Sequence, residues 1–362
     1  MTSLSRTQHA AAEARSENFP GSEPVSKTGK NDLGLASEFH RWPLPGYIWQ
    51  ALERRYQSIF CTEPHLRIHG SLDTHTEAWV SRQDGQIVAL ILFVRHGRIA
   101  KLINEVITLS QSNIDAFAHA LFQHYPKLTA ITMNGIDLVE PRSARHILLR
   151  QEFSEDYILT LPDTFELWMA GISSRTREKL RNYRRKIEKK YPDIHFYSMT
   201  GADISELKIR DVIQMNRHRM QIKGRQYGMS EEDENNLIIL MRERGQLSVI
   251  EIEGEGCAGL LCTLAGRDLY MHVIAHDAAY DDFRLGYLCA ASTIQAAISQ
   301  RLLRIHFLWG RYDYKTQLGA IRQPLYKICL IKNWFSCLRH PVLLITYLSW
   351  QMKAMLKYWK YR

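Results

Sequence analysis

Residues 268–315 hold the side chains whose types and order could support chemistry. An alternating apolar segment in this stretch ends at His276-Asp277, and an imidazole or a carboxylate placed there could accept a proton. A polar loop follows, and a glycine then opens an Ala-rich segment that is typical of a helix. The unpaired N–H groups and the positive dipole end of a helix start attract anions. We therefore expect five residues there to bind a phosphate-bearing ligand: Arg284, Leu285, Gly286, Tyr287 and Leu288.

The second apolar segment of this stretch, residues 305–309, carries the remaining candidates. Trp309 ends the segment and could stack on a sugar ring. Tyr314 and Lys315 follow after Gly310; the tyrosine could donate a proton to a leaving group or bind an acceptor, and the lysine could neutralise a phosphate or a carboxylate. Every candidate also has a structural interpretation: core aromatics for Trp309 and Tyr314, a solvated charge for Lys315, a hydrogen-bonded structural imidazole for His276 and a turn former for Asp277.

Hydrophobic periodicity predicts two blocks of elements that position these residues. The first block is expected to contain helices at 47–59 and 112–124 and strands at 78–82, 87–94, 99–108, 128–133 and 157–161. The second is expected to contain helices at 204–222, at 230–242 and from Gly286, and strands at 194–198, 247–252, 257–265, 269–275, 305–309 and 325–331. The shared order of three strands, a helix and a strand indicates an α/β (α+β) fold with an internal duplication.

The two blocks differ at the helix start that matters for anion binding. The corresponding helix of the first block begins at residues 109–113, Leu-Ser-Gln-Ser-Asn, with neither a glycine nor a basic residue. Only the second block is therefore expected to accept a phosphate.

Composition limits the class of protein. A chain of 362 residues with 45% hydrophobic and 23% charged residues suits a folded protein of two domains. The six cysteines form no C-x-x-C pair and the histidines are scattered, so we expect buried free thiols in a reducing compartment and no metal site. The sequence shows no signal-peptide pattern and no apolar run of bilayer length, so a cytoplasmic protein is expected.

The formal net charge of +9 is concentrated in two segments. Residues 173–191 hold nine Lys or Arg against two Glu, and residues 331–362 hold six Lys or Arg with no acidic residue. The first segment has a narrow apolar stripe at helical spacing, so it predicts a helix whose other faces are cationic. Its residues expected at an anionic surface are Arg177, Arg181, Arg184 and Arg185.

Three kinds of environment fit the cationic helix. It could be a solvated face, it could bind nucleic acid, or it could lie on an anionic membrane surface or a phosphorylated lipid-linked glycan. Because the chain has no recognisable DNA- or RNA-binding module, no nucleic acid partner is expected. Residues 342–362 interleave Leu, Tyr and Trp with Lys and Arg, which favours peripheral contact with the inner face of the cytoplasmic membrane; a helix docked on the core is the alternative.

The motifs together resemble a known family. A Ser-x-x-x-Arg-x-x-Leu-Arg pattern from Ser173 to Arg181, the Gly286 helix and the Gly310-x-x-x-Tyr314-Lys315 ending are similar to the GNAT acyltransferase superfamily, in its CelD-like branch. That branch is related to FemAB-type transferases, which are built from two GNAT-like halves. The family's (Arg/Gln)-x-x-Gly-x-(Gly/Ala) loop is altered here, because Phe283 takes its first position and Leu288 its last.

The resemblance implies an enzyme that transfers an acyl group from acetyl-CoA or another acyl-CoA to an amine or hydroxyl. The splayed strands of such sites, here 269–275 and 305–309, would offer N–H groups to the thioester carbonyl. The helix that borders the acceptor in such folds would supply Asn216, His218 and Arg219. CelD-like relatives imply a sugar or polysaccharide acceptor in cellulose-like or other exopolysaccharide synthesis. A catalytically silent scaffold on an anionic surface and a FemAB-like aminoacyl transferase are the alternatives.

The resemblance also implies a division of the chain into two tandem mixed-sheet domains joined by the basic helix. The expected parts are a disordered tail at 1–40, a degenerate GNAT-like domain at 41–165, the basic linker helix at 166–192, the acyl-CoA domain at 193–332 and a basic amphipathic segment at 333–362.

Overall fold

The computed structural model describes residues 26–28, 36–138 and 146–339, together with 341, 345 and 349. Most of the expected tail and most of the expected C-terminal segment lie outside these residues. Residues 36–40, which were expected in the tail, belong to strand β2 and pair with β3, so the folded part begins before residue 40. No helix within the described ranges is long and apolar enough to cross a membrane.

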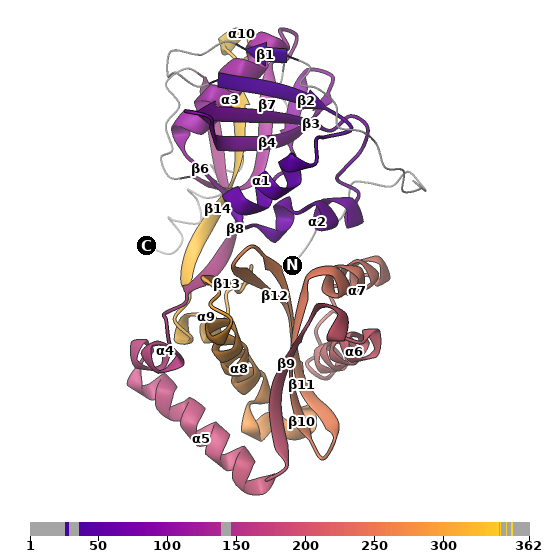
Figure 1. Ribbon diagram of the computed structural model, residues 1–362, viewed down its shortest axis with the longest axis vertical. Helices are drawn as coiled ribbons and strands as arrows, with labels where there is room; N and C mark the ends of the chain where they lie inside the picture. The colour runs from indigo at the N-terminus through magenta and orange to yellow at the C-terminus, as the bar shows by residue number, and fades with distance from the viewer. Residues whose placement is uncertain are drawn as a thin grey trace.

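The first half forms one end of the molecule (Figure 1). Its elements are β1 (Ser26–Thr28), β2 (Ala36–Arg41), α1 (Tyr47–Tyr56), η1 (Ile59–Cys61), α2 (Glu63–Ile68), β3 (Glu77–Gln83), β4 (Gln86–His96), β5 (Ile99–Leu102), β6 (Ile107–Leu109), α3 (Gln111–His124), β7 (Ala130–Leu138) and β8 (Ile147–Thr160). The single strand expected at 99–108 is thus two strands, β5 and β6.

The second half follows two connecting helices, α4 (Phe165–Gly171) and α5 (Ser174–Lys190). Its elements are β9 (Ile194–Thr200), η2 (Gly201–Asp203), α6 (Glu206–Ile222), α7 (Glu231–Arg244), β10 (Gly245–Ile252), β11 (Glu255–Ala265), β12 (Asp268–His276), η3 (Ala278–Phe283), α8 (Leu285–Ser299), β13 (Arg304–His306), α9 (Asp313–Gln317), β14 (Ile321–Ile331) and α10 (Trp334–Cys337). Two tandem mixed α/β halves are therefore confirmed.

A continuous sheet joins the halves. Its strand order is β1-β2-β3-β4-β5-β7-β14-β8-β13-β12-β11-β10-β9, with β6 paired to β7. β14 was expected within the second domain, yet it pairs along its length with β7 and β8 of the first half. β8 in turn pairs with β13, so each half takes part in the sheet of the other.

Local sequence explains where the helices begin and how they dock. Ser230 and Asp233 form a capping box at the start of α7, as the sequence predicts. The Ser173 side chain accepts a hydrogen bond from the Thr176 N–H at the start of α5. Gly259 lets α6 approach β11, because a Cβ at that position would lie 2.2 Å from a methyl carbon of Val212.

Each face of the second-half sheet is covered differently. α8 covers one face, and α6 and α7 cover part of the other. The remainder of that other face is covered by η1 and α2 of the first half, whose Ile59 and Phe60 pack on Tyr270 and Leu308. Arg244 pairs with Glu53 at 2.6 Å across the same boundary. The boundary between the halves is therefore a packed interface beside β12. All six cysteines are free and buried, as expected.

Candidate active site

The parallel strands β12 and β13 separate after a short pairing. Asp268, Leu269 and Tyr270 pair with the three residues of β13, and then β12 continues to His276 while the Phe307 N–H donates to the Tyr157 carbonyl of β8 at 2.8 Å. The corresponding strands of the first half stay together, because β6 extends the pairing with β7. Among the described residues, β12 has no strand partner on its β13 side beyond Tyr270, and the first half has no such opening between its parallel strands. The site was expected in the second half.

A β-bulge lies where β12 and β13 separate. Leu261 of β11 faces Val273 of β12, whereas the next residue, Cys262, faces Met271. His272 is therefore the extra residue of β12. A bulge re-aims a side chain and interrupts the ladder, and bulges are common beside active sites.

The start of α8 stands at the open end of β12. Arg284 caps the helix with a left-handed backbone, φ 54°, and its carbonyl accepts from the N–H groups of Tyr287 and Leu288. The side chains of Leu285 and Leu288 are buried in the core. Of the five residues predicted to bind a ligand, the groups suited to an anion are the exposed Arg284 guanidinium and the first two amides of the helix, those of Leu285 and Gly286.

His276 packs directly against Gly286. A Cβ on the glycine would lie 3.1 Å from His276 Nδ1, and His276 Nε2 lies 2.7 Å from Asp281 Oδ1. Burial lowers the pKa of His276, although the hydrogen bond that it donates to the Asp281 carboxylate opposes this shift. The glycine is therefore required for close packing of the helix on the strand, and His276 is a neutral imidazole fixed by Asp281 at the start of α8.

Four cations surround this corner. Burial lowers the pKa of Lys223, and the neighbouring Arg219, Arg225 and Arg284 lower it further against the opposing effect of Asp281. Arg219, predicted to border the acceptor, is thus part of the positive cluster at the start of α8. Lys223 was missed by sequence reasoning, although its place directly after α6 and before Gly224 was a usable signal.

Three other predicted site residues have no side-chain contact that supports the expected role. Asp277 is exposed, and its Oδ1 accepts from the Ala279 N–H at 2.9 Å, which is the turn-forming interpretation. Asn216 is partly buried on α6, and His218 is exposed on the same helix.

Tyr314 and Lys315, both on α9, are placed differently. Tyr314 packs on the α8-side core with its ring 6.2 Å from that of Phe307, and burial raises its pKa to about 12. Arg219 also acts on this hydroxyl, so Tyr314 belongs with the cationic corner. Lys315 is 2% exposed, and its Nζ donates to the carbonyls of Leu308 and Trp309 at 2.8 and 2.7 Å. Lys315 therefore holds the turn after β13 and does not face a ligand.

Trp309 lies at the boundary between the halves. It is 39% exposed, and its ring centroid lies 5.8 Å from that of Phe60 in η1. This position agrees with a stacking surface, and it brings a first-half side chain to the predicted site.

The basic helix α5 reaches the same corner through η3. Lys186 and Lys190 lie 5.0 and 5.4 Å from the ring of Phe283, next to Arg284. Three of the four residues expected at an anionic surface have partners within the protein. Arg177 turns inward and donates to the Ile172 carbonyl, Arg184 stacks on Phe196 and pairs with Glu188, and Arg185 donates to Asn182. Arg181 is exposed.

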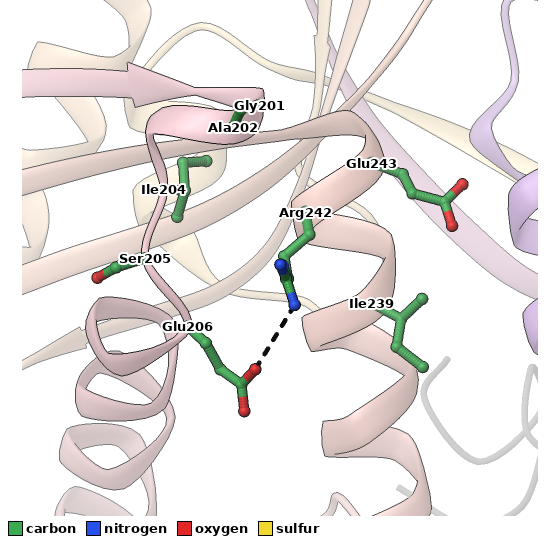
Figure 2. A pocket seen from close by; sticks show the side chains of 8 residues that line it. All are labelled: Gly201, Ala202, Ile204, Ser205, Glu206, Ile239, Arg242 and Glu243. Carbon is green, nitrogen blue, oxygen red and sulfur yellow. Dashed lines mark ion pairs between the residues drawn. The ribbon is translucent and has the colours of Figure 1, made fainter.

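The described hollows do not coincide with this corner. The one shown in Figure 2, of about 680 Å³, is lined by η2, the start of α6 and the end of α7, and contains the ion pair of Arg242 with Glu206 at 3.9 Å. None of its lining residues was predicted to take part in chemistry. Among the described residues, no group of His, Cys, Asp and Glu is arranged to hold a metal ion.

Comparison with known proteins agrees with this geometry. Residues 174–316 match the family described as an acetyltransferase (GNAT) domain. The chain is similar to the solved structure of FemX at 10% identity and a TM-score of 0.59, covering 85% of this chain and 100% of that one. It is also similar to L-PGS from Bacillus licheniformis, at 14% identity and a TM-score of 0.47, covering 85% and 97%. No curated protein matches the sequence.

Three observations define an acyltransferase domain. The mixed sheet contains a parallel pair of strands that separate, a helix begins at the open end between them, and the family match covers this region. Residues 174–316 form an acetyltransferase (GNAT) domain, and the chain shares its fold with the solved structure of FemX.

Proposed function

We propose that this acyltransferase takes an acetyl or other acyl group from CoA. We propose that the acceptor is an amine or hydroxyl of a sugar or polysaccharide precursor in envelope or exopolysaccharide synthesis, as the resemblance to the CelD-like branch implies. The observation that carries the proposal is the cationic corner of Arg219, Lys223, Arg225 and Arg284 at the start of α8. The diphosphate of CoA needs cations and free N–H groups of this kind.

The chain's own residues have distinct tasks in this reaction. Arg284 and the amides that open α8 would hold the diphosphate, and CoA would supply the activated thioester. The backbone of β12 beyond Tyr270 would offer N–H groups to the thioester carbonyl, because β13 no longer pairs with it there. Tyr314, with its raised pKa, would return a proton to the departing thiolate.

Titration with acetyl-CoA by calorimetry tests this proposal. R284A and K223A should each weaken binding about tenfold, since one charge-assisted contact contributes about 1.5–3 kcal/mol. R301A is a matched control, because Arg301 is also exposed with a left-handed backbone but lies at the other end of α8. Absence of binding at millimolar acetyl-CoA would contradict CoA as the donor and favour a silent scaffold.

Contact with a membrane is proposed for the α10 region. Trp334, Phe335 and Leu338 are 77%, 80% and 82% exposed, next to Lys332 and Arg339. Exposed aromatic and aliphatic side chains beside cations suit the interface of an anionic bilayer. α10 and α5 lie at opposite ends of the long axis in Figure 1, so a bilayer bound at α10 would leave α5 for a different anion.

A second candidate is an aminoacyl transferase that uses aminoacyl-tRNA. The specific observation is that α5 adjoins the cationic corner through Lys186 and Lys190 on Phe283, so the positive charge continues from this corner onto α5. A low-salt gel shift with tRNA separates the candidates. Binding that requires Lys186 and Lys190 and competes with CoA would favour the tRNA donor, whereas no shift would remove it.

A further inference from the structure

A group of rings from both halves lies on the face of the second-half sheet opposite α8. Tyr270 and His272 of β12 and Thr263 of β11 belong to this face, where η1 and α2 of the first half pack. His272 Nε2 lies 2.7 Å from the Thr263 hydroxyl. His65 and His69 of the α2 region are close enough to act on each other's charge and on that of His272.

The first half contributes a row of rings beside His272. The centroid of His69 lies 4.1 Å from that of His65, His65 lies 5.0 Å from Phe60, and Phe60 lies 5.8 Å from Trp309 of the second half. We call these four residues the inter-half row. It runs past the point where β12 and β13 separate, because Phe60 also contacts the ring of Tyr270 at 6.1 Å.

One atom in this group has no protein partner. His65 Nδ1 is buried, and no hydrogen bond to it exists among the described residues. A buried polar atom normally has a partner, so this nitrogen points to a ligand that is absent here. His272 is partly buried at the bulge, and its only described hydrogen bond is the one to Thr263, which leaves Nδ1 for a second partner.

The electrostatic character of the group selects a neutral ligand. Burial lowers the pKa of His272 to about 4 and lowers that of His65 well below its usual range, with His69 adding to both shifts. Both imidazoles are therefore uncharged near neutral pH. The cation nearest on α2, Arg67, is paired with Glu63 and Glu243. Neutral imidazoles and aromatic faces suit a hydroxyl-bearing ring and not an ionic acceptor.

We propose that the inter-half row and His272 form the acceptor subsite for a neutral sugar, with His272 as the catalytic base. The proposal rests on the proposed acyl transfer and specifies its acceptor side. The sugar stacks on Trp309, which Phe60 supports from behind, His65 Nδ1 bonds one of its hydroxyls, and the reacting hydroxyl or amine lies at His272 Nδ1. In the tautomer that donates Nε2–H to Thr263, Nδ1 holds the lone pair that accepts a proton.

The step balances without any further reactant. The acceptor oxygen or nitrogen attacks the acyl carbonyl of the thioester, forming the new C–O or C–N bond, and its proton passes to His272 Nδ1. The C–S bond breaks, and the thiolate takes a proton from Tyr314. Transfer of the proton from His272 through solvent to Tyr314 restores both residues. Donor and base then lie on opposite faces of the sheet, with the separating strands between them.

Histidine NMR tests the subsite without a donor. The Hε1 signals of His65 and His272, assigned with H65Q and H272Q, are followed while methyl β-glucoside or N-acetylglucosamine, both uncharged, is added. His195 is the matched control, because it is exposed on β9. Saturable shifts at His65 and His272 but not at His195 support the subsite. No shift at either histidine up to the solubility limit overturns it, and this outcome is independent of whether CoA binds.

Thiol release from acetyl-CoA tests the role of the base. H272Q should lower sugar-dependent release about 100-fold, with acetyl-CoA affinity changed less than about twofold. T263V provides an alternative test should H272Q fail to fold. It keeps the volume of the side chain and removes the hydrogen bond that sets the His272 tautomer, so it should also lower the rate of sugar-dependent thiol release. A folded H272Q or T263V protein with the wild-type rate would refute the assignment of the base, and H195Q should leave the rate unchanged.

Discussion

A buried charge network joins the two halves, and its pH dependence can be worked out from the structure. His306 of β13 is 4% exposed; its Nδ1 lies 2.6 Å from Asp156 of β8 and its Nε2 lies 3.2 Å from Asp268 of β12. Arg304 also pairs with Asp268, and the ring of Tyr270 stacks on His306 at 4.2 Å. Burial alone would lower the pKa of His306, but the two carboxylates outweigh it and the net pKa is raised.

The loss of unfolding free energy expected on removing His306 follows from the partners that the two carboxylates keep. In H306Q, Asp268 keeps Arg304, but Asp156 loses its described hydrogen-bond partner while 1% exposed. Removing one member of a buried ion pair costs about 3–5 kcal/mol. We expect a loss near 3 kcal/mol at pH 6, because Asp268 stays paired and Gln can donate one hydrogen bond to Asp156.

The sign of the pH dependence is set by the raised pKa. His306 ionises in the unfolded chain near 6.5 and at a higher pH in the folded chain. Its charge therefore stabilises the wild type fully below pH 6.5, and this contribution is lost as the pH rises through the folded pKa. In alkaline solution, the difference in unfolding free energy between wild type and H306Q should therefore shrink to about 1 kcal/mol, the contribution of a neutral hydrogen bond.

Urea unfolding of both proteins between pH 5.5 and about pH 9 measures this difference. H195Q, at an exposed site on β9, controls for a general effect of removing a histidine. A difference that stays constant over the whole range would refute a protonated His306. A difference below about 1 kcal/mol at pH 6 would refute the network as a stabilising link between the halves.

Three further outcomes are expected. K315M should destabilise the protein by about 2 kcal/mol in urea, since it removes two hydrogen bonds to carbonyls, while acetyl-CoA affinity should stay within about twofold by calorimetry. G259A should cost about 3 kcal/mol or more because α6 must move, whereas G256A, with its nearest atom at 4.0 Å, should be well tolerated. Co-sedimentation with anionic vesicles should fall about tenfold when Trp334 and Phe335 are both changed to serine.

Matched controls make these outcomes decisive. K189M changes an exposed lysine of α5, and L207S changes a 74% exposed leucine of α6 that is far in sequence from α10. Equal stability of K315M and K189M, or loss of acetyl-CoA binding in a stable K315M protein, would mean that Lys315 faces a ligand. Equal vesicle binding of the wild type and the Trp334 and Phe335 double variant would remove α10 as a membrane contact.

Local signals explain how much of the fold the sequence predicts. The Ser230 cap, the glycine at the start of α8 and the alternating residues of β11 and β12 all predict elements that the structure contains. Short elements escaped prediction: α2 has six residues and α9 five, too few for a periodic pattern. The first part of β8 was also missed, because residues 150–156 are rich in polar side chains and pair with a strand far along the chain.

The candidate site also contains some residues whose positions a local motif predicts and others whose positions depend on tertiary packing. Arg284 and Gly286 are close in sequence, so their place at the start of α8 could be predicted from one motif, whereas Lys223 and Arg225 come from the end of α6 and were not predicted. The hydrogen bonds of Lys315 could not be predicted from the sequence, because its carbonyl partners depend on the left-handed turn at Leu308 and the positive φ of Gly310. The proximity of His65 to His272, close enough for one to influence the other's charge, depends on how the halves pack, and no spacing in the sequence encodes it.

The shared strands give a physical reason for retaining the first half. β14 completes the first-half sheet, and β8 pairs with β13, so neither half would keep all its strand partners if separated. β8 also holds Asp156 against His306 at the last paired residue of β13, just before the strands separate. The first half therefore fixes the geometry of the second-half opening from one side through β8, and on the other side it brings His65 of α2 close enough to influence His272. The first half can therefore shape the second-half site through strand pairing and packing alone.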